Sequence, residues 1–438
     1  MPFFFPTGPS AMLPSIGDNS ACAVIDHSSL GRDMGNFSTK YVEVVEHIFP
    51  TCLYNSWIVI VILYLWICMK RVKQADTPEF VSKDSLLKAY FQEKCFGLQT
   101  VLVPTVWAHS CHLQTALAMI VSPDSPIRFV REYLEMKDGG IIGLDWDVTN
   151  STDKPVNGPK KTKAPSRPIL LIVYDTLATG AGIDRVCAEA GKQGFQAVVF
   201  RRRGQDYVPL TTPRLQSFGD PSDLREAVEY IKAVEPNSEI VALSLSAGCG
   251  LLFSYLGEYG SSTHIASAAC ISPVYSAREF YDSSSIPIWW QKLWLQRQKL
   301  VYMRHSTVLY DNDSDYTQCE LAMRSRTLST FHQRVHVRLN GYSSWDLYWA
   351  ENEPLRDVDE VATPLLCVSS KDDPLVPEDS IPVELFQTYP HFFLALTQKG
   401  GHCGFFQGLF PSSWSERLAV EFLKVSLDAD FRKSLSTS

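Results

Sequence analysis

Ser246 stands where a short apolar run rich in strand formers, Glu239–Leu245, meets small residues and then a helical pattern, Leu251–Leu256. The segment Ser244-Leu245-Ser246-Ala247-Gly248 therefore matches small-x-Ser-x-Gly between a predicted strand and a predicted helix. In this arrangement the tight turn projects one side chain from the strand end and directs the next helix N-terminus towards it. A hydroxyl placed there can be activated by a histidine, and backbone N–H groups can stabilise the oxyanion that develops. The pattern predicts a nucleophilic serine, although a five-residue match of common small residues is more often a structural turn.

A carboxylate follows a second predicted strand. Thr363–Ser370 has the composition of a buried strand and runs directly into Asp372 and Asp373, in a charged turn closed by prolines. A side chain at the carboxyl end of a strand lies where an open α/β sheet collects its site residues. Asp373 is preferred because Pro377 then falls four residues on, as in related strand-end acids, but Asp372 stays open as the alternative. Both could instead belong to an ordinary strand-end turn.

A histidine follows a third predicted strand, Phe392–Leu396. Glycines flank His402 on both sides, which lets the backbone bend and leaves the imidazole unobstructed. Alone, it could be a satisfied surface histidine. The chain order Ser246, Asp373, His402 is that of α/β-hydrolases, in which the histidine takes the serine proton and the acid orients the ring. Three signals in this order, each at a strand end, predict a catalytic triad.

Many further short motifs occur in a fixed order between about Thr100 and Leu423. They are His112-Leu113-Gln114-Thr115, Arg131-Glu132, Lys137-Asp138-Gly139-Gly140, Leu144-Asp145-Trp146, Arg203-Gly204, Pro209–Leu215, Asp223-Leu224-Arg225, Tyr255–Gly260, Gly341-Tyr342, Asp372–Pro377 and Gly400-Gly401-His402. On these residues the chain resembles the type-4 subfamily of α/β-hydrolases, a group of membrane-anchored lipid esterases with bacterial and plant relatives. The resemblance implies the α/β-hydrolase fold and esterase chemistry.

Two positions depart from the pattern of this family. The first small residue of the turn, commonly glycine, is Ser244, which should preserve the turn with some crowding. After the predicted strand Pro168–Tyr174, the Gly-Leu-Thr-Gly-like oxyanion loop of the family is replaced by Asp175–Gly180.

The resemblance implies an oxyanion hole made of backbone N–H groups, one from Ala247 and one from Thr176 or Leu177. The glycine missing from the loop could displace one of these donors, and removing such a donor slows the chemistry by ~10²–10³. Asp175 also places a negative charge near the developing oxyanion unless its side chain points away. These changes weaken the enzyme hypothesis without removing the triad.

Strand and helix patterns alternate along the chain, as a doubly wound, mostly parallel sheet requires. The expected strands are Pro168–Tyr174, Phe195–Arg201, Ile240–Leu243, Ile265–Ile271, Leu365–Ser369 and Phe392–Leu396, preceded by a hairpin over Arg128–Trp146. The alternation breaks at a helical, aromatic-rich insertion over roughly residues 275–355, which is predicted to form a cap. The predicted fold class is α/β, with the α/β-hydrolase arrangement and this cap.

Most aromatic rings of the insertion are expected to form the core of the cap. The same composition could also wall an acyl-binding pocket beside a membrane, because burying an alkyl chain gains ~0.8 kcal/mol per CH₂. Arg201-Arg202-Arg203 ends a strand on the site side and could hold a phosphate headgroup or form a solvated turn.

Composition and charge exclude several other classes of protein. With 438 residues, of which 45% are hydrophobic and 12% aromatic, the chain can bury a large core. The low balance of Lys and Arg, 40 against 48 Asp and Glu, argues against nucleic-acid binding, and the modest net charge of −8 indicates no particular acidic or basic partner. Eleven cysteines without a Cys-x-x-Cys pair indicate reduced thiols rather than a disulfide framework. The spacing in His109-Ser110-Cys111-His112 fits no common zinc site, and the predicted chemistry needs neither a metal nor a cofactor.

An apolar run near the N-terminus predicts a membrane anchor. Leu53–Met69 is almost uncharged and close to the ~17–25 residues that span a bilayer, with Tyr and Trp where interface anchors would lie. Lys70, Arg71 and Lys73 follow at once, which places the hydrolase domain in the cytosol by the positive-inside rule. Family members are often described with the opposite orientation, so the topology stays open. The short span suits the endoplasmic reticulum or another endomembrane, and a core helix or late signal sequence is the alternative.

The expected order along the chain has five parts. They are a disordered tail over residues 1–50, a transmembrane anchor over 51–72, a juxtamembrane segment over 73–100, the hydrolase domain over 101–425 and a C-terminal tail over 426–438.

The function predicted from these features is that of a membrane-anchored serine hydrolase cleaving lipid or other acyl esters. Its expected partners are the ester substrate and the membrane, with no nucleic acid. A different class of function is a catalytically weak or inactive scaffold that binds a protein partner or a lipid without turnover, which Ser244 and the Asp175–Thr176 loop support. Chemistry with a carboxylate nucleophile is disfavoured because Ser246 occupies the turn.

Overall fold

The structure, a computed structural model, describes residues 56–64, 66–67, 70, 77–149, 167–175, 180–282, 286–309 and 313–428. The chain divides into two compact units, one ending at Ile67 and the other beginning at residue 68. The fold described below is that of the second unit.

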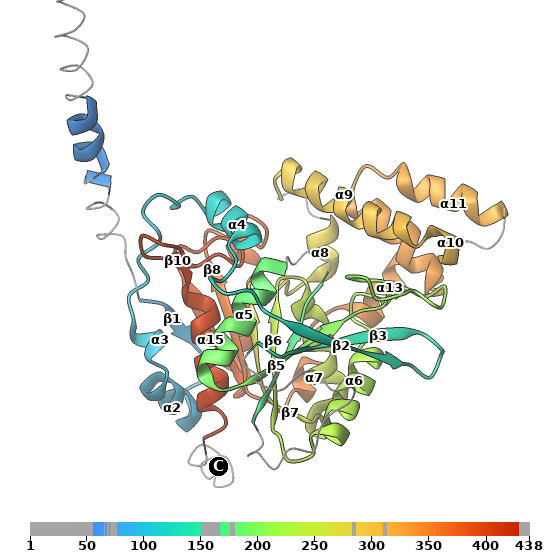
Figure 1. Cartoon of the computed structure of the whole chain (residues 1–438), viewed down its shortest axis with the longest axis horizontal. Coiled ribbons are helices and arrows are strands. Elements are labelled where there is room, and N and C mark those ends of the chain that lie inside the picture. Colours follow the sequence, from blue (N-terminus) through green and yellow to red (C-terminus); the bar gives the residue numbers. More distant parts are fainter. Residues whose placement is uncertain are drawn as a thin grey trace, which may run out of the picture. The chain divides into compact units, whose positions relative to one another are not determined.

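A nine-stranded sheet forms the centre of this unit (Figure 1). Its order is β1-β9-β8-β7-β6-β4-β5-β3-β2, and the strands from β9 to β5 run parallel, with antiparallel neighbours at both edges. The strands are β1 (Glu79–Val81), β2 (Phe129–Glu135), β3 (Ile141–Asp147), β4 (Ile169–Val173), β5 (Gln196–Arg201), β6 (Ile240–Leu245), β7 (Ile265–Ile271), β8 (Leu365–Ser370) and β9 (Phe392–Thr397). The predicted strands, hairpin and α/β class are confirmed.

Two hydrophobic cores lie on the two faces of the sheet, because successive side chains of a strand point to opposite sides. In β4, Leu170 and Ile172 belong to one core, whereas Leu171 and Val173 belong to the other. The first core is covered by α2 (Leu86–Lys94), α3 (Phe96–Gln99), α5 (Gly180–Gln193) and α15 (Trp414–Val425). The second is covered by α6 (Ser222–Val234), α7 (Gly248–Tyr259) and α14 (Val383–Thr388).

Residues expected to be a juxtamembrane segment are part of the sheet and its core. Strand β1 pairs antiparallel with β9, with Phe80 opposite Ala395. In α2, the fully buried ring of Phe91 stacks on Phe422 of α15 with centroids 4.2 Å apart. The fold therefore includes Glu79 and does not begin at residue 101. The sequence could not show this, because a three-residue strand has almost no pattern of its own and its partner lies at the far end of the chain.

The cap consists of helices inserted between β7 and β8. They are α8 (Ala277–Asp282), α9 (Ile288–Arg304), α10 (Ser306–Leu309), α11 (Asp313–Met323), α12 (Leu328–His332), a π-helical turn (Gln333–Val337) and α13 (Trp345–Asn352), drawn in yellow and orange in Figure 1. The rings of Trp290, Trp294, Tyr302, Tyr348 and Trp349 are buried. These rings form a cap core, as expected.

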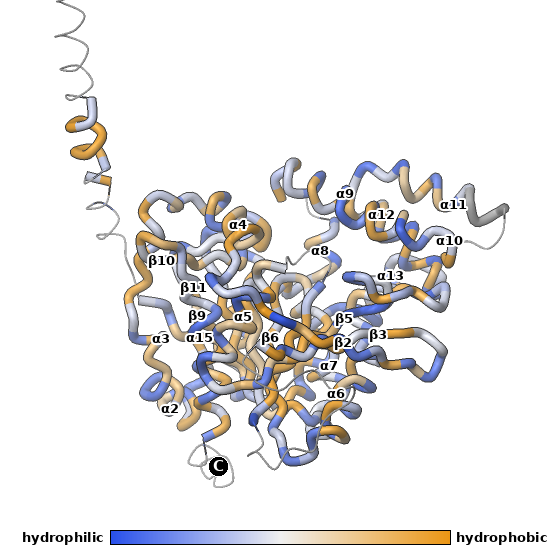
Figure 2. Tube along the Cα trace, viewed as in Figure 1, coloured by the Kyte–Doolittle hydropathy of each residue, from blue (hydrophilic) through white to orange (hydrophobic). Residues whose placement is uncertain are grey.

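Across the described part of the chain, no helix combines the length and the apolar character needed to cross a bilayer. The anchor expected over residues 51–72 lies partly outside the described residues. Those described within it are helical, and residues 56–64 are mostly apolar (Figure 2), with exposed side chains such as Trp57 and Ile62. The tail expected over residues 1–50, and residues 429–438, also lie outside the described residues.

Candidate active site

The turn after β6 presents Ser246 at the carboxyl edge of the sheet. Ser246 has a φ of 55°, in the left-handed region that residues other than glycine seldom adopt, and its N–H donates to Ile271 O at 2.9 Å. Helix α7 begins two residues later at Gly248. A Cβ there would lie 2.6 Å from Cα of Tyr174, so only glycine lets the helix start so close to the end of β4. The strand-turn-helix geometry of a nucleophile elbow follows from these contacts.

Ser244 fits the turn through a hydrogen bond. Its side chain is fully buried, and Oγ donates to Val173 O of β4 at 2.7 Å. The hydroxyl thus joins the ends of two neighbouring strands where the family usually has glycine. The departure at this position is accommodated.

The three residues predicted as a triad lie together although they come from three different loops. Ser246 Oγ is 2.7 Å from His402 Nε2, and His402 Nδ1 is 2.8 Å from Asp373 Oδ2. All three side chains are buried. In this geometry the imidazole can accept the serine proton at one nitrogen while the carboxylate accepts a hydrogen bond from the other.

The two neighbouring aspartates make different contacts. Besides its contact with His402, Asp373 accepts hydrogen bonds at Oδ1 from the N–H groups of Leu375 and Val376, at 2.8 and 3.1 Å. Asp372 Oδ1 instead accepts from the N–H groups of Gly400 and Gly401, at 2.9 and 3.0 Å. The structure therefore places Asp373 beside the imidazole, and Asp372 fixes the loop that carries it.

Thr115 of α4 (Cys111–Ile120) holds the histidine loop from the other side. Its Oγ1 accepts from the N–H of His402 at 2.9 Å and donates to Cys111 O at 2.7 Å. Gly401 has a φ of 61°, and a Cβ on it would lie 2.5 Å from Cys111 O, which explains a glycine here. Gln114 extends the same support by accepting from Phe406 N at 2.8 Å. The sequence identified these two residues as a family motif but not their role, which depends on a contact across the chain.

The surroundings of His402 raise its pKa well above the usual value. Burial, the largest single influence, opposes the charged imidazolium, but the carboxylate of Asp373 and neighbouring Cys403 favour it and prevail. A more basic imidazole is a stronger acceptor for the proton of Ser246 once it is neutral.

The expected oxyanion donors are only partly described. Ala247 precedes the first residue of α7, where N–H groups have no intrahelical partner and can point at an anion. Thr176 and Leu177 lie outside the described residues. Asp175, the last described residue before them, lines a cavity under the cap. Burial in this cavity raises the pKa of Tyr281 and lowers that of His336 to about 4, and the charge of Asp175 favours the protonated form of both side chains.

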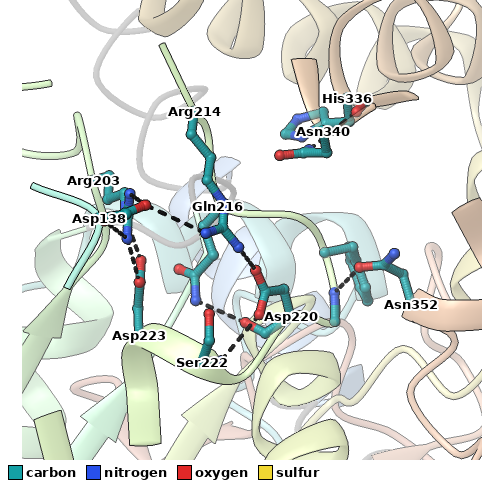
Figure 3. A network of polar contacts seen from close by, with 12 residues as sticks. Asp138, Arg203, Arg214, Gln216, Asp220, Ser222, Asp223, His336, Asn340 and Asn352 are labelled. Atoms are coloured by element: carbon teal, nitrogen blue, oxygen red, sulfur yellow. Dashed lines mark hydrogen bonds and ion pairs between the residues drawn. The ribbon is translucent and has the colours of Figure 1, made fainter. Parts of the chain in front are cut away.

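Three consecutive arginines, of which the first is the last residue of β5, have different environments. Arg201 forms ion pairs with Asp145 and Asp206, each at 2.7 Å. Arg203 is held between Asp138 and Asp223, at 2.6 Å to each (Figure 3). Both are structural ion pairs, so of the three only Arg202 remains as a candidate for ligand binding.

No group of three or more His, Cys, Asp or Glu side chains is arranged to hold a metal ion within the described residues. Cys111, part of the His109–His112 segment, is a free thiol.

Comparisons with known proteins show the family of the chain. The family model described as serine aminopeptidase, S33, matches residues 167–406. Protein ABHD15 of Homo sapiens is 40% identical over 325 residues, which cover 73% of this chain and 67% of that protein. Phospholipase ABHD3 of Mus musculus is 27% identical over 360 residues, covering 81% and 85%, and monoacylglycerol lipase ABHD2 of Danio rerio is 24% identical over 382 residues, covering 82% and 86%. Among solved structures, the Pyrococcus furiosus esterase Pf2001 is 15% identical with a TM-score of 0.40, covering 71% of this chain and 98% of that one.

Proposed function

The chain belongs to the α/β-hydrolases matched by the serine aminopeptidase S33 family model, and we propose that it is a serine hydrolase that cleaves carboxylic esters of lipids or of other acyl groups. The observation that carries this proposal is the buried relay from Ser246 Oγ through His402 to Asp373, with both contacts below 3 Å.

In the proposed reaction Ser246 is the nucleophile. His402 Nε2 takes its proton as Oγ attacks the ester carbonyl, and Asp373 stabilises the imidazolium that forms. The imidazolium then protonates the departing alcohol, which leaves an acyl group on Ser246. A water molecule activated by the same imidazole releases the carboxylic acid and restores the serine.

Backbone N–H groups would stabilise the oxyanion in both steps. One is that of Ala247, and the second is proposed to come from Thr176 or Leu177. Without the family's glycine in this loop, a displaced donor would lower the rate by ~10²–10³ and still leave the relay intact.

The substrate class is proposed from the relatives. Two of them are named a phospholipase and a monoacylglycerol lipase, which favours lipid esters as substrates. The run Leu53–Met69 supports a second part of the proposal, that the chain is held at a membrane by a single anchor, with an endomembrane such as the endoplasmic reticulum as the location and the hydrolase domain in the cytosol.

A fluorophosphonate probe tests the proposal, because it reacts with an activated serine and reports the modified residue by mass spectrometry. We expect an adduct on Ser246 of the unaltered chain and none on Ser246→Ala. Ser262→Ala, which changes an exposed serine of the same fold, is the matched control and should label normally. An unlabelled wild type, or equal labelling of Ser246→Ala, would contradict the proposal.

The scaffold alternative rests on the Asp175–Thr176 loop. If the unaltered chain shows no esterase activity and the double variant Asp175→His with Thr176→Gly gains it, the chain is a scaffold whose oxyanion loop no longer supports catalysis. A protein complex that survives Ser246→Ala with full cellular function would point the same way.

A further inference from the structure

A cavity of about 80 Å³ lies under the cap, at the carboxyl edge of the sheet. Asp175 follows β4 and Arg202 follows β5, and both line the cavity from the side of the sheet. Gln298 of α9 and His332 of α12 line it from the cap. Its volume is sufficient for several water molecules or one small organic group, since a single water needs roughly 10–15 Å³ of such space.

Polar atoms without a partner are concentrated around this cavity. The carboxamide oxygens Oε1 of Gln205, Gln216 and Gln298 are buried and accept no hydrogen bond from the described residues, and Nδ1 of His332 and His336 are equally unpartnered there. Each such group destabilises the empty protein, by roughly 1–3 kcal/mol. Five of them around one cavity indicate that a polar guest completes their hydrogen bonds.

The amide of Gln216 has a fixed orientation. Its Nε2 donates to Asp220 O at 3.0 Å, so its oxygen must be the atom left open (Figure 3). Gln298 Nε2 lies 3.5 Å from the hydroxyl of Tyr281, a group that can donate as well as accept, so this contact does not fix the orientation of that amide. The cavity therefore presents hydrogen-bond acceptors that need O–H or N–H donors from a guest.

His332 supplies a donor to the same cavity. The hydroxyl of Tyr348 accepts a hydrogen bond from Phe218 N at 3.0 Å. Its own proton can be donated to His332 Nε2, which lies 2.8 Å away. Burial lowers the pKa of His332 well below its usual value, which favours the neutral ring. Because Nε2 then accepts from Tyr348, the proton of the ring is on Nδ1.

Arg202 adds a cationic donor. Unlike its two neighbours, it makes no ion pair with any described residue, and its Nε donates to Tyr174 O at 3.2 Å. A guest under the cap thus meets a guanidinium, the carboxyl group of Asp175, a neutral N–H donor and several carbonyl acceptors.

This mixture discriminates among ligand classes. A phosphate or carboxylate would suit Arg202 but would face carboxamide oxygens with no proton to offer them. An ammonium group would suit those oxygens and Asp175 but would be repelled by Arg202, and Asp175 repels an anion in the same way. A hydroxyl group both donates and accepts, so it satisfies both sets of atoms.

We propose that the cavity between the cap and the carboxyl edge of the sheet binds a neutral polyol, a small group with hydroxyls on adjacent carbons. For a serine esterase, this group would be the alcohol part of the substrate. That last step rests on the proposed function, whereas binding of the polyol does not.

Binding is best measured on the full chain carrying Ser246→Ala, in which turnover is absent. The probe is glycerol, titrated by saturation-transfer NMR against 1-propanol, which has the same carbon skeleton and one hydroxyl. Glycerol 3-phosphate and ethanolamine represent the anionic and cationic classes. We expect glycerol to bind at least about tenfold more tightly than 1-propanol and than either charged probe, because each completed hydrogen bond contributes about 0.5–1.5 kcal/mol.

Variants in the same background locate the site. Gln298→Leu should weaken glycerol binding about tenfold. Gln205→Leu provides a second test should Gln298→Leu fail to fold. Gln333→Leu, on the exposed side of the same cap, should bind glycerol as the parent does.

The proposal is overturned if glycerol and 1-propanol bind equally, if a charged probe binds more tightly than glycerol, or if Gln298→Leu and Gln205→Leu leave binding unchanged. Absence of glycerol binding would overturn it as well, and would mean that the cavity holds water only. Fluorophosphonate labelling of the unaltered chain reports separately on the proposed function. A labelled chain that does not bind glycerol loses only this inference, and an unlabelled chain that binds glycerol loses only the esterase proposal.

Discussion

At the carboxyl edge, the side chains of Ser246, His402 and Asp373 contact one another in series, and neighbouring backbone groups occupy the remaining oxygen of the acid. Under the cap, carboxamide oxygens and imidazole nitrogens are just as buried but have no partners among the described residues. The three side chains of the first region satisfy one another, as positioned chemistry requires, because catalytic groups must be held before a substrate arrives. The second region lacks what a guest would supply. The contrast separates atoms arranged for reaction from atoms arranged for recognition.

The largest effect is expected from Asp373→Asn. The amide keeps the shape of the side chain but removes the charge that orients and stabilises the imidazolium, so kcat for ester hydrolysis should fall about 10⁴-fold. Asp372→Asn, which retains an oxygen for the N–H groups of Gly400 and Gly401, is the matched control and should stay within about tenfold of the parent. An equal loss of kcat in the two variants would show that Asp373 contributes no more to catalysis than Asp372 does.

The pH dependence of the same pair gives an independent readout. Hydrolysis requires neutral His402, so kcat/KM falls as the pH drops through the pKa of this residue. Asp373 raises that pKa, so removal of its charge in Asp373→Asn should move the acid limb to lower pH. An unchanged limb in the pH–rate profile would contradict the assigned electrostatic role.

Gly248→Ala should be the next largest change. Its methyl group would lie 2.6 Å from Cα of Tyr174, a backbone atom that cannot move aside cheaply. We expect a loss of about 3 kcal/mol in the free energy of unfolding, measured with urea, and slower fluorophosphonate labelling of Ser246. Gly180→Ala, where an added Cβ meets nothing within 4 Å, should leave both quantities unchanged.

Thr115→Val tests the support of the histidine loop. The isosteric change leaves the N–H of His402 and the carbonyl of Cys111 without the hydroxyl that pairs them, which should cost about 2 kcal/mol in the free energy of unfolding. Thr388→Val, at an exposed position on α14, should change that free energy by less than about 0.5 kcal/mol. A Thr115→Val protein as stable as the parent would show that the loop is held by other contacts.

Gln298→Leu should change the free energy of unfolding least, and it should not lower this free energy. Because its carboxamide oxygen is already unpartnered, replacing it with an apolar group should leave the free energy of unfolding unchanged or raise it by up to about 1 kcal/mol in the absence of a polyol. Thermal unfolding without and with glycerol checks this, since only the parent should gain stability from the ligand. A clear loss of stability would mean that the oxygen has a structural partner, and the two regions would then no longer differ.

The sequence was informative wherever a pattern is local. Apolar runs ending in small or charged residues located six parallel strands, and the order of Ser246, Asp373 and His402 placed them at strand ends where side chains meet. By contrast, β1 was missed because its pattern covers three residues, and Arg201 could not be told from Arg202 because both stand in the same run of charge. Their different roles depend on which acids the fold brings alongside.

What the sequence alone determined is the alternation of elements and the chemistry available at each strand end, since hydrophobic period and residue type are properties of the chain itself. What only the tertiary structure decided is which groups acquire a partner. Asp373 rather than Asp372 lies beside the imidazole, Thr115 holds a loop far away in the chain, and the cap closes over glutamines that nothing in the described chain completes. Such pairing depends on distances of about 3 Å between residues remote in sequence, and those distances exist only once the chain has packed.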